Sequence, residues 1–288
     1  MASLPKLSTV VSWIIYLIPL YIFIFAPLLR QLFPESSETE LDEPDYDTNI
    51  PSHLTDDSFI SPEDGIPIHC PAGSDDYKVH ILSLEPLVIY IEDFLKDWEA
   101  DHLVDVSVGN YTPSIVYDGV TQKVDTSKRL SDRALLSRDD IVRCIEDRAR
   151  AFQGWRPNLY IERMWAQRYN ASGHYGYHYD WAGTARRGGD RISTFMVYLG
   201  DECTGGGTNF PRLRMPQGEQ WCRFLECEEG HEEGGITFRP IKGNAIFWMN
   251  LRADGSGYPE TWHKAFPVKE GVKVGLNIWS WYEPPEWR

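Results

Sequence analysis

The stretch Tyr175–Asp180, YGYHYD, places a histidine and an aspartate two positions apart, His178 and Asp180. In an extended segment such residues point to the same side, so both side chains can bind one metal ion. On its own a His-x-Asp pair is weak evidence for a metal site, because a histidine beside an aspartate more often makes a surface hydrogen bond. A later strand could bring His263 to the same ion. Two imidazoles and one carboxylate form the facial triad of non-haem Fe(II) sites, which leaves other iron positions open.

Lys273 lies ten residues past His263, in a segment (272–281) that otherwise reads as an apolar strand. An ammonium inside a barrel is costly unless an anion pairs with it. The distal carboxylate of a dicarboxylate cosubstrate is such an anion. A lysine at a strand edge that faces water is the alternative.

Six motifs follow one another around these residues. They are Gln167-Arg168-Tyr169, His178-x-Asp180, Arg191-Ile192-Ser193-Thr194, GGGTNFP over 205–211, GNAIFWMNL over 243–251, and His263 with Lys273. Their order and spacing resemble the prolyl 4-hydroxylase alpha-subunit family. Two further segments, LSLEP over 82–86 and Phe94-Leu95, resemble the opening of that catalytic domain. The resemblance therefore covers the chain from about Tyr77 to the carboxyl terminus, and it does not cover residues 1–76.

The resemblance implies a double-stranded β-helix that holds Fe(II) through His178, Asp180 and His263. 2-Oxoglutarate would chelate the iron, and Lys273 would bind its far carboxylate. O2 would take the last iron position, and ascorbate would reduce overoxidised iron. The implied reaction hydroxylates a substrate and gives succinate and CO2.

The resemblance also places further side chains around the cosubstrate and the substrate. The cosubstrate group is Tyr198, Tyr169, Thr208 and Trp248, and the substrate group is Tyr175, Arg129 and Trp181. Plain packing is the alternative for the aromatic residues and Thr208, and a solvated guanidinium is the alternative for Arg129.

Short strand-like runs predominate in the second half of the chain. They are Leu159–Tyr169, Ile192–Leu199, Ile236–Phe238, Ala245–Met249 and Val274–Tyr282. With helices earlier in the chain, they predict a mainly β, α+β domain, a jelly-roll barrel with supporting helices.

The earlier part of the domain contains both kinds of element. Residues 84–91, LEPLVIYI, look like a strand, and residues 97–108 show near-helical apolar spacing. Ser137, followed by Asp140, resembles a helix N-cap. The helix that follows would bury an apolar face against a sheet; this face consists of Ile141, Ile145, Ala149 and Phe152.

Residues 10–29, VVSWIIYLIPLYIFIFAPLL, are twenty residues without a charge. Such a run crosses about 30 Å of hydrocarbon as a helix. A cleavable signal peptide or a buried core helix is the alternative, but the run is long for a signal peptide and no A-x-A site follows it. We expect a tail over 1–9, a single transmembrane signal anchor over 10–29, an acidic, proline-rich linker over 30–76 and the dioxygenase domain over 77–288.

The positive charges that flank the anchor are nearly balanced, so they hardly decide its orientation. Sequons at Asn110 and Asn170 favour a luminal domain. We therefore expect a protein of the endoplasmic reticulum membrane with a luminal catalytic domain. Asn170 follows Tyr169 directly, and we expect Asn170 to be unmodified because a glycan there would crowd the cleft.

The net charge of −15 argues against a nucleic-acid partner, because an acidic surface repels phosphate backbones. The five cysteines are too few and too irregularly spaced for a disulfide-dense scaffold or a paired CxxC zinc site. At most two disulfides fit, which leaves one thiol, and two of Cys203, Cys222 and Cys227 could pair. A second metal site in the segment 212–235, which holds Cys222, Cys227, His231 and a run of glutamates, is a minor alternative. The sequence identifies no partner subunit.

The first interpretation is a hydroxylase that acts on prolyl residues of a peptide or protein. A 2-oxoglutarate dioxygenase for another residue or a small molecule is the alternative within the same chemistry. A catalytically silent, membrane-tethered module that binds proline-rich peptides is the alternative from another class. Zinc hydrolase chemistry is disfavoured, because no glutamate lies within a histidine helix motif as a general base.

Overall fold

The structure is a computed structural model that describes residues 59–62, 65, 67–117, 121–227 and 234–283. The expected signal anchor over 10–29 and residues 30–58 of the expected linker lie outside the described residues. In the described part of the chain, no helix is both long and apolar enough to span a membrane.

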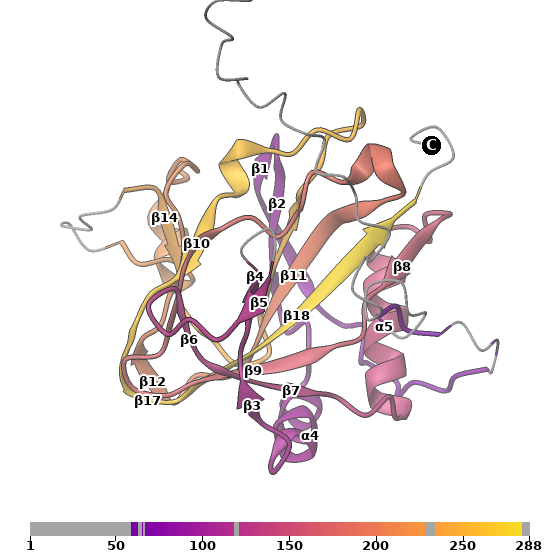
Figure 1. Cartoon of the computed structure of the whole chain (residues 1–288), viewed down its shortest axis with the longest axis horizontal. Helices are drawn as coiled ribbons and strands as arrows, with labels where there is room; N and C mark the ends of the chain where they lie inside the picture. The colour runs from indigo at the N-terminus through magenta and orange to yellow at the C-terminus, as the bar shows by residue number, and fades with distance from the viewer. Residues whose placement is uncertain (1–58, 63–64, 66, 118–120, 228–233, 284–288) are drawn as a thin grey trace, which may run out of the picture. The chain divides into compact units, whose positions relative to one another are not determined.

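Two antiparallel sheets form the body of the domain (Figure 1). The larger contains β1 (Lys78–Leu84), β2 (Leu87–Glu92), β3 (Thr112–Pro113), β7 (Asp132–Leu135), β8 (Leu159–Ile161), β9 (Trp165–Tyr169), β11 (Asp190–Gly200), β15 (Ala245–Met249) and β18 (Lys273–Tyr282). The smaller contains β6 (Arg129–Leu130), β10 (His174–His178), β13 (Thr208–Phe210), β14 (Ile236–Phe238) and β16 (His263–Ala265). The strand orders are β1-β2-β15-β11-β18-β9-β7-β3, with β8 beside β18, and β14-β13-β16-β10-β6.

The remaining elements are short apart from two α-helices. They are α4 (Asp97–Ser107), α5 (Asp140–Phe152), the 3-10 turns η2 (Ala185–Arg187), η3 (Glu219–Arg223) and η4 (Pro259–Thr261), and the strand pairs β4 (Val116–Tyr117) with β5 (Gln122–Lys123) and β12 (Cys203–Gly205) with β17 (Val268–Gly271). The expectation of a mainly β domain with supporting helices is confirmed.

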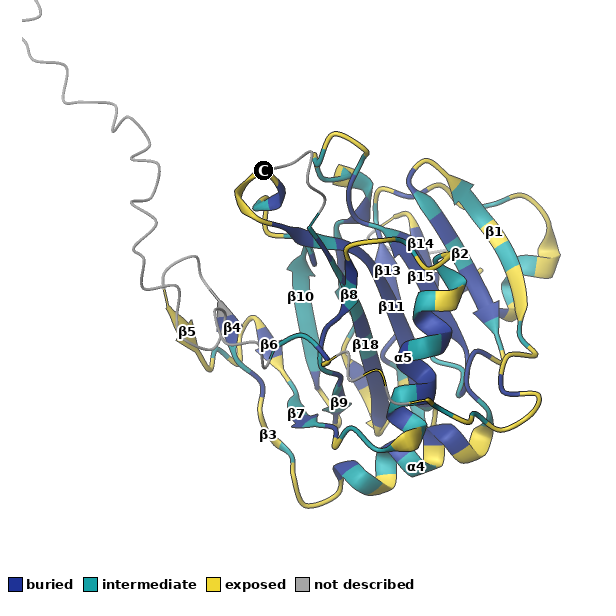
Figure 2. Cartoon of the chain, turned by 90° about the vertical axis from the view of Figure 1, so that its right-hand side faces the viewer, coloured by how far each residue is buried: buried dark blue, intermediate teal, exposed yellow. Residues whose placement is uncertain are grey.

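Alternation along β11 separates the two layers of the core. Phe195 and Val197 point toward α4 and α5, which cover one face of the larger sheet (Figure 2). Met196 and Tyr198 point to the opposite face and pack with side chains of the smaller sheet, such as Phe210. The functional candidates therefore lie between the sheets, on the face away from the helices.

Two of the expected strands are wrong in their extent. Residues 84–91 form a hairpin and not one strand, because β1 ends at Leu84 and β2 begins at Leu87, its partner. Pro86 lies in the turn, and a proline has no N–H for a strand ladder. The run 159–169 is split into β8 and β9, which pair with different parts of β18, Ile161 with Ser280 and Trp165 with Asn277.

The helix over residues 140–152 forms as expected, but Asp139 caps it and not Ser137. The Asp139 side chain accepts hydrogen bonds from the backbone N–H groups of Ile141 and Val142, at 3.1 and 3.0 Å. Such a cap satisfies two N–H groups that have no partner within the helix. The expected apolar face lies against the core of the larger sheet.

Residues 59–76, expected as linker, pack against the domain where they are described. The Phe59 ring lies 5.3 Å from the ring of Trp281, and Ile60 forms a β-bridge with Glu162. A disulfide joins Cys70 to Cys144 on α5, with a Cα–Cα distance of 5.6 Å. These contacts correct the expected linker boundary at residue 76. The composition of the segment does not reveal the residues that it contacts.

The second disulfide joins Cys222 to Cys227, and Cys203 is a free thiol. Two bridges and one thiol agree with the expectation from the sequence. The disulfide removes Cys222 and Cys227 from the minor alternative of a second metal site, because a sulfur in a disulfide is not a thiolate ligand. His231 of that alternative lies outside the described residues.

Candidate active site

His178, Asp180 and His263 meet between the sheets, and one ligand atom from each lies within 4.8 Å of the others. His178 ends β10 and His263 begins β16, and these two residues pair directly across the strands. Asp180 Oδ1 lies 3.6 Å from His178 Nε2 and 4.0 Å from His263 Nε2. The pairing of β10 with β16 thus brings the two histidines together, and Asp180 joins them from a bend just past the end of β10.

Hydrogen bonds to backbone carbonyls orient both imidazoles. Nδ1 of His178 lies 2.8 Å from the Gly176 carbonyl, and Nδ1 of His263 lies 2.9 Å from the Thr261 carbonyl. A carbonyl oxygen only accepts, so each Nδ1 carries a hydrogen, and Nε2 is the ring nitrogen that faces Asp180. Such partners are typical of histidines that bind metals.

The protonation states suit metal binding. Burial lowers the pKa of His178 to about 3, and His263 acts in the same direction, so the imidazole is neutral at physiological pH. Burial alone would raise the pKa of Asp180. The neighbouring His263, His178 and Arg191, with a hydrogen bond from Thr194, outweigh burial and lower that pKa, so the carboxyl is ionised. Two imidazoles and a carboxylate are a donor set that fits Fe(II).

Lys273 is 1% exposed, so the alternative of a lysine at a water-facing edge is wrong. Its Nζ donates to the Gly206 carbonyl at 2.7 Å and lies 5.4 Å from the ring centres of both Tyr169 and Tyr198. Burial lowers the pKa of Lys273 to about 8, and Cys203 opposes this effect in part. Among the described residues no carboxylate forms a salt bridge with this ammonium, so an anionic ligand would fit there.

Three predicted cosubstrate residues surround Lys273. The Tyr198 hydroxyl donates to Thr208 Oγ1 at 2.9 Å, and both side chains are buried. The Tyr169 hydroxyl donates to Gln167 Oε1 at 2.9 Å. The cosubstrate-binding roles expected for these three side chains stay predictions.

Strand β16 links this lysine cluster to the metal candidates. His263 and Ala265 are two positions apart and therefore share one face of the strand. Ala265 pairs with Thr208, the hydrogen-bond partner of Tyr198. Both groups of side chains consequently lie along the same interior face.

A cavity of 170 Å³ opens beside His178 and Asp180, and Tyr175 and Arg129 contribute to its lining. The Tyr175 ring stacks on His178 at 3.7 Å, and the Arg129 guanidinium lies 4.4 Å from the centre of that ring. Arg129 is 8% exposed and donates to Gln167 Oε1 at 2.7 Å, so the alternative of a solvated arginine is wrong.

Comparison with known proteins agrees with this geometry. The 2OG-Fe(II) oxygenase superfamily matches residues 164–281, which include the three metal candidates and Lys273. Prolyl 4-hydroxylase 2 of Arabidopsis thaliana is 32% identical over 214 residues, which cover 70% of this chain and 69% of that protein. This chain belongs to the prolyl 4-hydroxylase family. Probable prolyl 4-hydroxylase 8 of the same plant is 28% identical over 254 residues, 85% of this chain and 83% of its own length.

A solved structure shows the same fold. The 2OG complex of the viral collagen prolyl hydroxylase from Paramecium Bursaria Chlorella virus-1 gives a TM-score of 0.52 at 23% identity. The match covers 68% of this chain and 96% of the viral chain.

Two tryptophans expected at the site of this prolyl 4-hydroxylase family member lie outside the cavity lining. Trp181 donates from Nε1 to Thr261 Oγ1 at 3.3 Å, and its ring lies 4.5 Å from that of Tyr179. Trp248 is 1% exposed, and its ring lies 5.0 Å from His263. Trp248 therefore contacts a metal candidate and not the cavity, and Trp181 packs at the rim.

Sequence reasoning missed part of the cavity wall. The missed lining residues are Ile115, Gln122, Tyr179, Arg191 and Trp279. The Arg191 guanidinium lies 3.8 Å from the Trp279 ring centre and pairs with Glu162 at 2.6 Å. Trp279 is an even number of positions from Lys273 on β18 and shares its face, a signal that could have found it.

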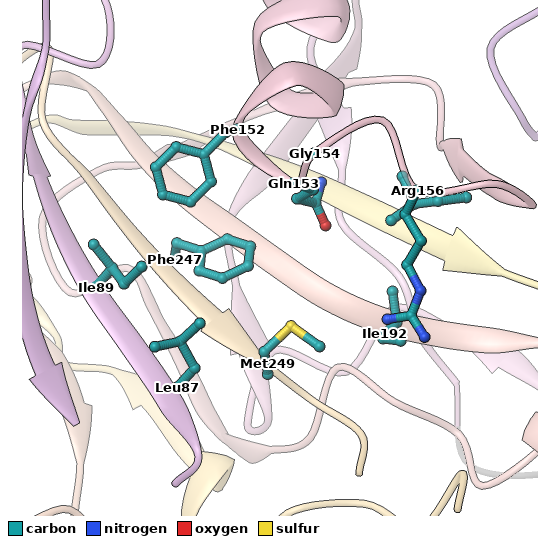
Figure 3. Close-up of a pocket in the computed structure, with 10 residues that line it drawn as sticks. Leu87, Ile89, Phe152, Gln153, Gly154, Arg156, Ile192, Phe247 and Met249 are labelled. Carbon is teal, nitrogen blue, oxygen red and sulfur yellow. The ribbon is translucent and has the colours of Figure 1, made fainter. Parts of the chain in front are cut away.

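A larger cavity of 320 Å³ lies on the helix-covered side of the larger sheet (Figure 3). Its walls come from β2, β15 and the end of α5 and are mainly apolar; they include Leu87, Ile89, Phe152, Phe247 and Met249. Arg156 is the one charged residue that lines it in the described part of the chain. This cavity has no group of metal-binding or nucleophilic side chains, so size alone does not make it the reaction site of this prolyl 4-hydroxylase family member.

Proposed function

We propose that the chain is an Fe(II)- and 2-oxoglutarate-dependent prolyl 4-hydroxylase that acts on a proline-containing peptide or protein. The observation that carries this proposal is the convergence of His178 Nε2, His263 Nε2 and Asp180 Oδ1 beside a cavity. A domain that also buries the ammonium of Lys273, which forms no salt bridge with a described carboxylate, suits an anionic cosubstrate such as 2-oxoglutarate. The names of the A. thaliana relatives support proline as the target.

The side chains have separate tasks in this proposal. His178, Asp180 and His263 hold the iron, which when bound supplies the oxidation of the substrate by O2. Lys273 binds the far carboxylate of 2-oxoglutarate, and the Tyr198 hydroxyl can turn from Thr208 to donate to the same carboxylate. Ascorbate would serve as the external reductant for such a site.

The cavity wall provides the contacts for a peptide. The Arg129 guanidinium can donate to substrate carbonyls, while the ring of Tyr175 holds Arg129 on one side and His178 on the other. Packing of Tyr175 on His178 also restricts where the substrate can approach the iron. These contacts position the target carbon.

We further propose a luminal domain anchored in the endoplasmic reticulum membrane by residues 10–29. The two disulfides support this location, because such bridges persist in oxidising compartments. Protection of the domain from added protease in intact microsomes tests it, and digestion of the domain in intact vesicles would contradict it. Peptide mapping tests the expectation that Asn170 carries no glycan.

The decisive experiment measures succinate release by the purified chain with Fe(II), 2-oxoglutarate, ascorbate and a proline-rich peptide. We expect turnover in the wild type and in His174→Ala, a control on the same strand, and none in His178→Ala. Mass spectrometry of the peptide should find the added oxygen on proline. Oxygen on another residue would favour a different dioxygenase, and bound iron without turnover on any peptide would favour a silent binding module.

A further inference from the structure

We infer that Trp248, Asn250 and Thr194 form a one-way hydrogen-bond chain that positions Asp180 to bind the metal through a single oxygen. Trp248 Nε1 donates to Asn250 Oδ1 at 2.8 Å, and Asn250 Nδ2 donates to Thr194 Oγ1 at 3.0 Å. Thr194 Oγ1 then donates to Asp180 Oδ2 at 2.8 Å. The inference rests on the proposed function, because it concerns the ligand set of that site.

The indole at the start of the chain sets the direction of every bond. An indole N–H only donates, so Asn250 presents its carbonyl oxygen to Trp248 and its NH2 group to Thr194. The Thr194 oxygen therefore accepts from Asn250, and its single hydrogen remains for Asp180. The series of hydrogen bonds ends on Asp180 Oδ2, which acts as an acceptor, as an oxygen of an ionised carboxylate does.

Burial makes this direction obligatory. Thr194 and Asn250 are 0% exposed and Trp248 is 1% exposed, so bulk water does not replace a broken bond. A rotated Asn250 amide would set its NH2 group against the indole N–H and leave both without an acceptor. An unsatisfied buried polar group is costly, so the rotated state is disfavoured.

The chain controls which carboxylate oxygen faces the metal. With Oδ2 bound to Thr194, Oδ1 is the atom near His178 Nε2 and His263 Nε2, at 3.6 and 4.0 Å. Binding through both oxygens would make Oδ2 share its electron density between the metal and the Thr194 hydroxyl, which weakens its binding to each. Single-oxygen binding leaves one more position on the ion for other ligands.

Trp248 also acts on the site through its ring, which packs edge-on against His263 at 5.0 Å. One side chain thus contacts one ligand directly and orients another through two intermediates. Trp248, Asn250 and Thr194 are positioning residues, because none of them contributes a ligand atom to the group of three.

Titration of the metal-free full chain with Co(II) tests the inference, since the visible absorption of Co(II) reports the number and arrangement of its ligands. Thr194→Val keeps the shape and removes the hydroxyl. We expect it to weaken Co(II) binding by about 10- to 100-fold and to change the Co(II) spectrum. Thr194→Ser keeps the hydroxyl and should bind and absorb like the wild type. Trp248→Phe keeps a ring beside His263 and should shift both readouts in the same direction as Thr194→Val, by less.

Each outcome bears on the inference. Wild-type affinity and spectrum in Thr194→Val overturn it, as does a Thr194→Ser variant as weak as Thr194→Val, because the retained hydroxyl would then not support metal binding. Thermal unfolding of the metal-free variants checks the fold, and if Thr194→Val does not fold, wild-type behaviour of Trp248→Phe overturns the inference. A wild-type chain that binds no Co(II) overturns the proposed function as well, whereas unchanged variants of a chain that binds Co(II) overturn the inference alone.

Discussion

Replacement of Lys273 by methionine should stabilise the ligand-free protein while it abolishes cosubstrate binding. Burial lowers the pKa of Lys273 from 10.5 to about 8. At 1.36 kcal/mol per unit, this corresponds to a destabilisation of about 3 kcal/mol while the ammonium is charged. Methionine has a similar length and no charge. Loss of the bond to the Gly206 carbonyl offsets about 1 kcal/mol, so we expect a net gain of about 2 kcal/mol at pH 7.

The pH dependence has a definite sign. Because the folded-state pKa lies below the unfolded-state value, the full destabilisation applies below about pH 8. Between about pH 8 and 10.5 the unfolded state holds a proton that the folded state has lost, so stability of the wild type rises with pH. Lys273→Met should show no such rise from this position, and its advantage should shrink across that window.

Urea unfolding of the purified chain at pH 7 and pH 10 measures both effects. Lys269→Met is the matched control, because Lys269 is exposed and its replacement should change stability by less than about 0.5 kcal/mol. Calorimetry of 2-oxoglutarate binding above pH 8, in two buffers of different ionisation enthalpy, should show proton uptake in the wild type. A Lys273→Met variant that is less stable than the wild type at pH 7 would refute the reasoning.

Other substitutions separate binding, ion pairing and cross-linking. Tyr198→Phe removes the hydroxyl near Lys273 and should raise the KM for 2-oxoglutarate about fivefold with little change in kcat, whereas an unchanged KM would contradict the proposed role. Arg191→Met leaves Glu162 without its partner and should lower the unfolding free energy by about 2 kcal/mol, less than for a fully buried pair because the Arg191 side chain is 30% exposed. A loss below about 0.5 kcal/mol in urea would show that the pair is screened. Cys70→Ser opens a bridge across 74 residues and should lower stability by about 4 kcal/mol, and a free Cys70 thiol in non-reducing peptide mapping would contradict the pairing.

The metal candidates could be read from the sequence because few chemistries use their residue types in that arrangement. His178 and Asp180 are two positions apart, a spacing that puts both side chains on one side of an extended segment. In the structure Asp180 lies in a bend past the end of β10, and its Oδ1 still lies 3.6 Å from His178 Nε2. A lysine within an apolar strand has few explanations besides an anionic partner, and the burial of Lys273 agrees with that reasoning. Strands 236–238 and 245–249 were also predictable, because short β-rich runs between turns favour strands.

The remaining features depend on contacts between segments that are distant in the chain. The bond from Arg129 to Gln167 joins β6 to β9, and nothing in either short segment predicts it. Cys144 pairs with Cys70 although three other cysteines lie closer to one another in sequence. The cap at Asp139 differs from the expected Ser137 because both residue types cap helices and only the local backbone decides between them.

Adjacent side chains of strand β11 point to opposite faces, one toward the helix-covered core and the next toward the metal candidates. Substitutions at two neighbouring positions should therefore change different properties, stability at one and metal affinity at the other. Phe195 points to the helices and contacts the rings of Phe94, Phe152 and Phe247 at 5.3, 5.4 and 4.7 Å. Phe195→Ala should therefore lower the unfolding free energy by about 3–5 kcal/mol. Thr194 points to the other face, where its hydroxyl donates to Asp180, one of the three metal candidates.

We expect Phe195→Ala to keep wild-type Co(II) affinity at a temperature where it is folded, whereas Thr194→Val loses affinity at a smaller loss of stability. The physical reason is the alternation of the strand, since the two side chains share a backbone but no contacts. Equal loss of Co(II) affinity in both variants would show that the site responds to the stability of the sheet as a whole. The one-oxygen geometry of Asp180 would then follow from the fold in general and not from the Trp248 chain.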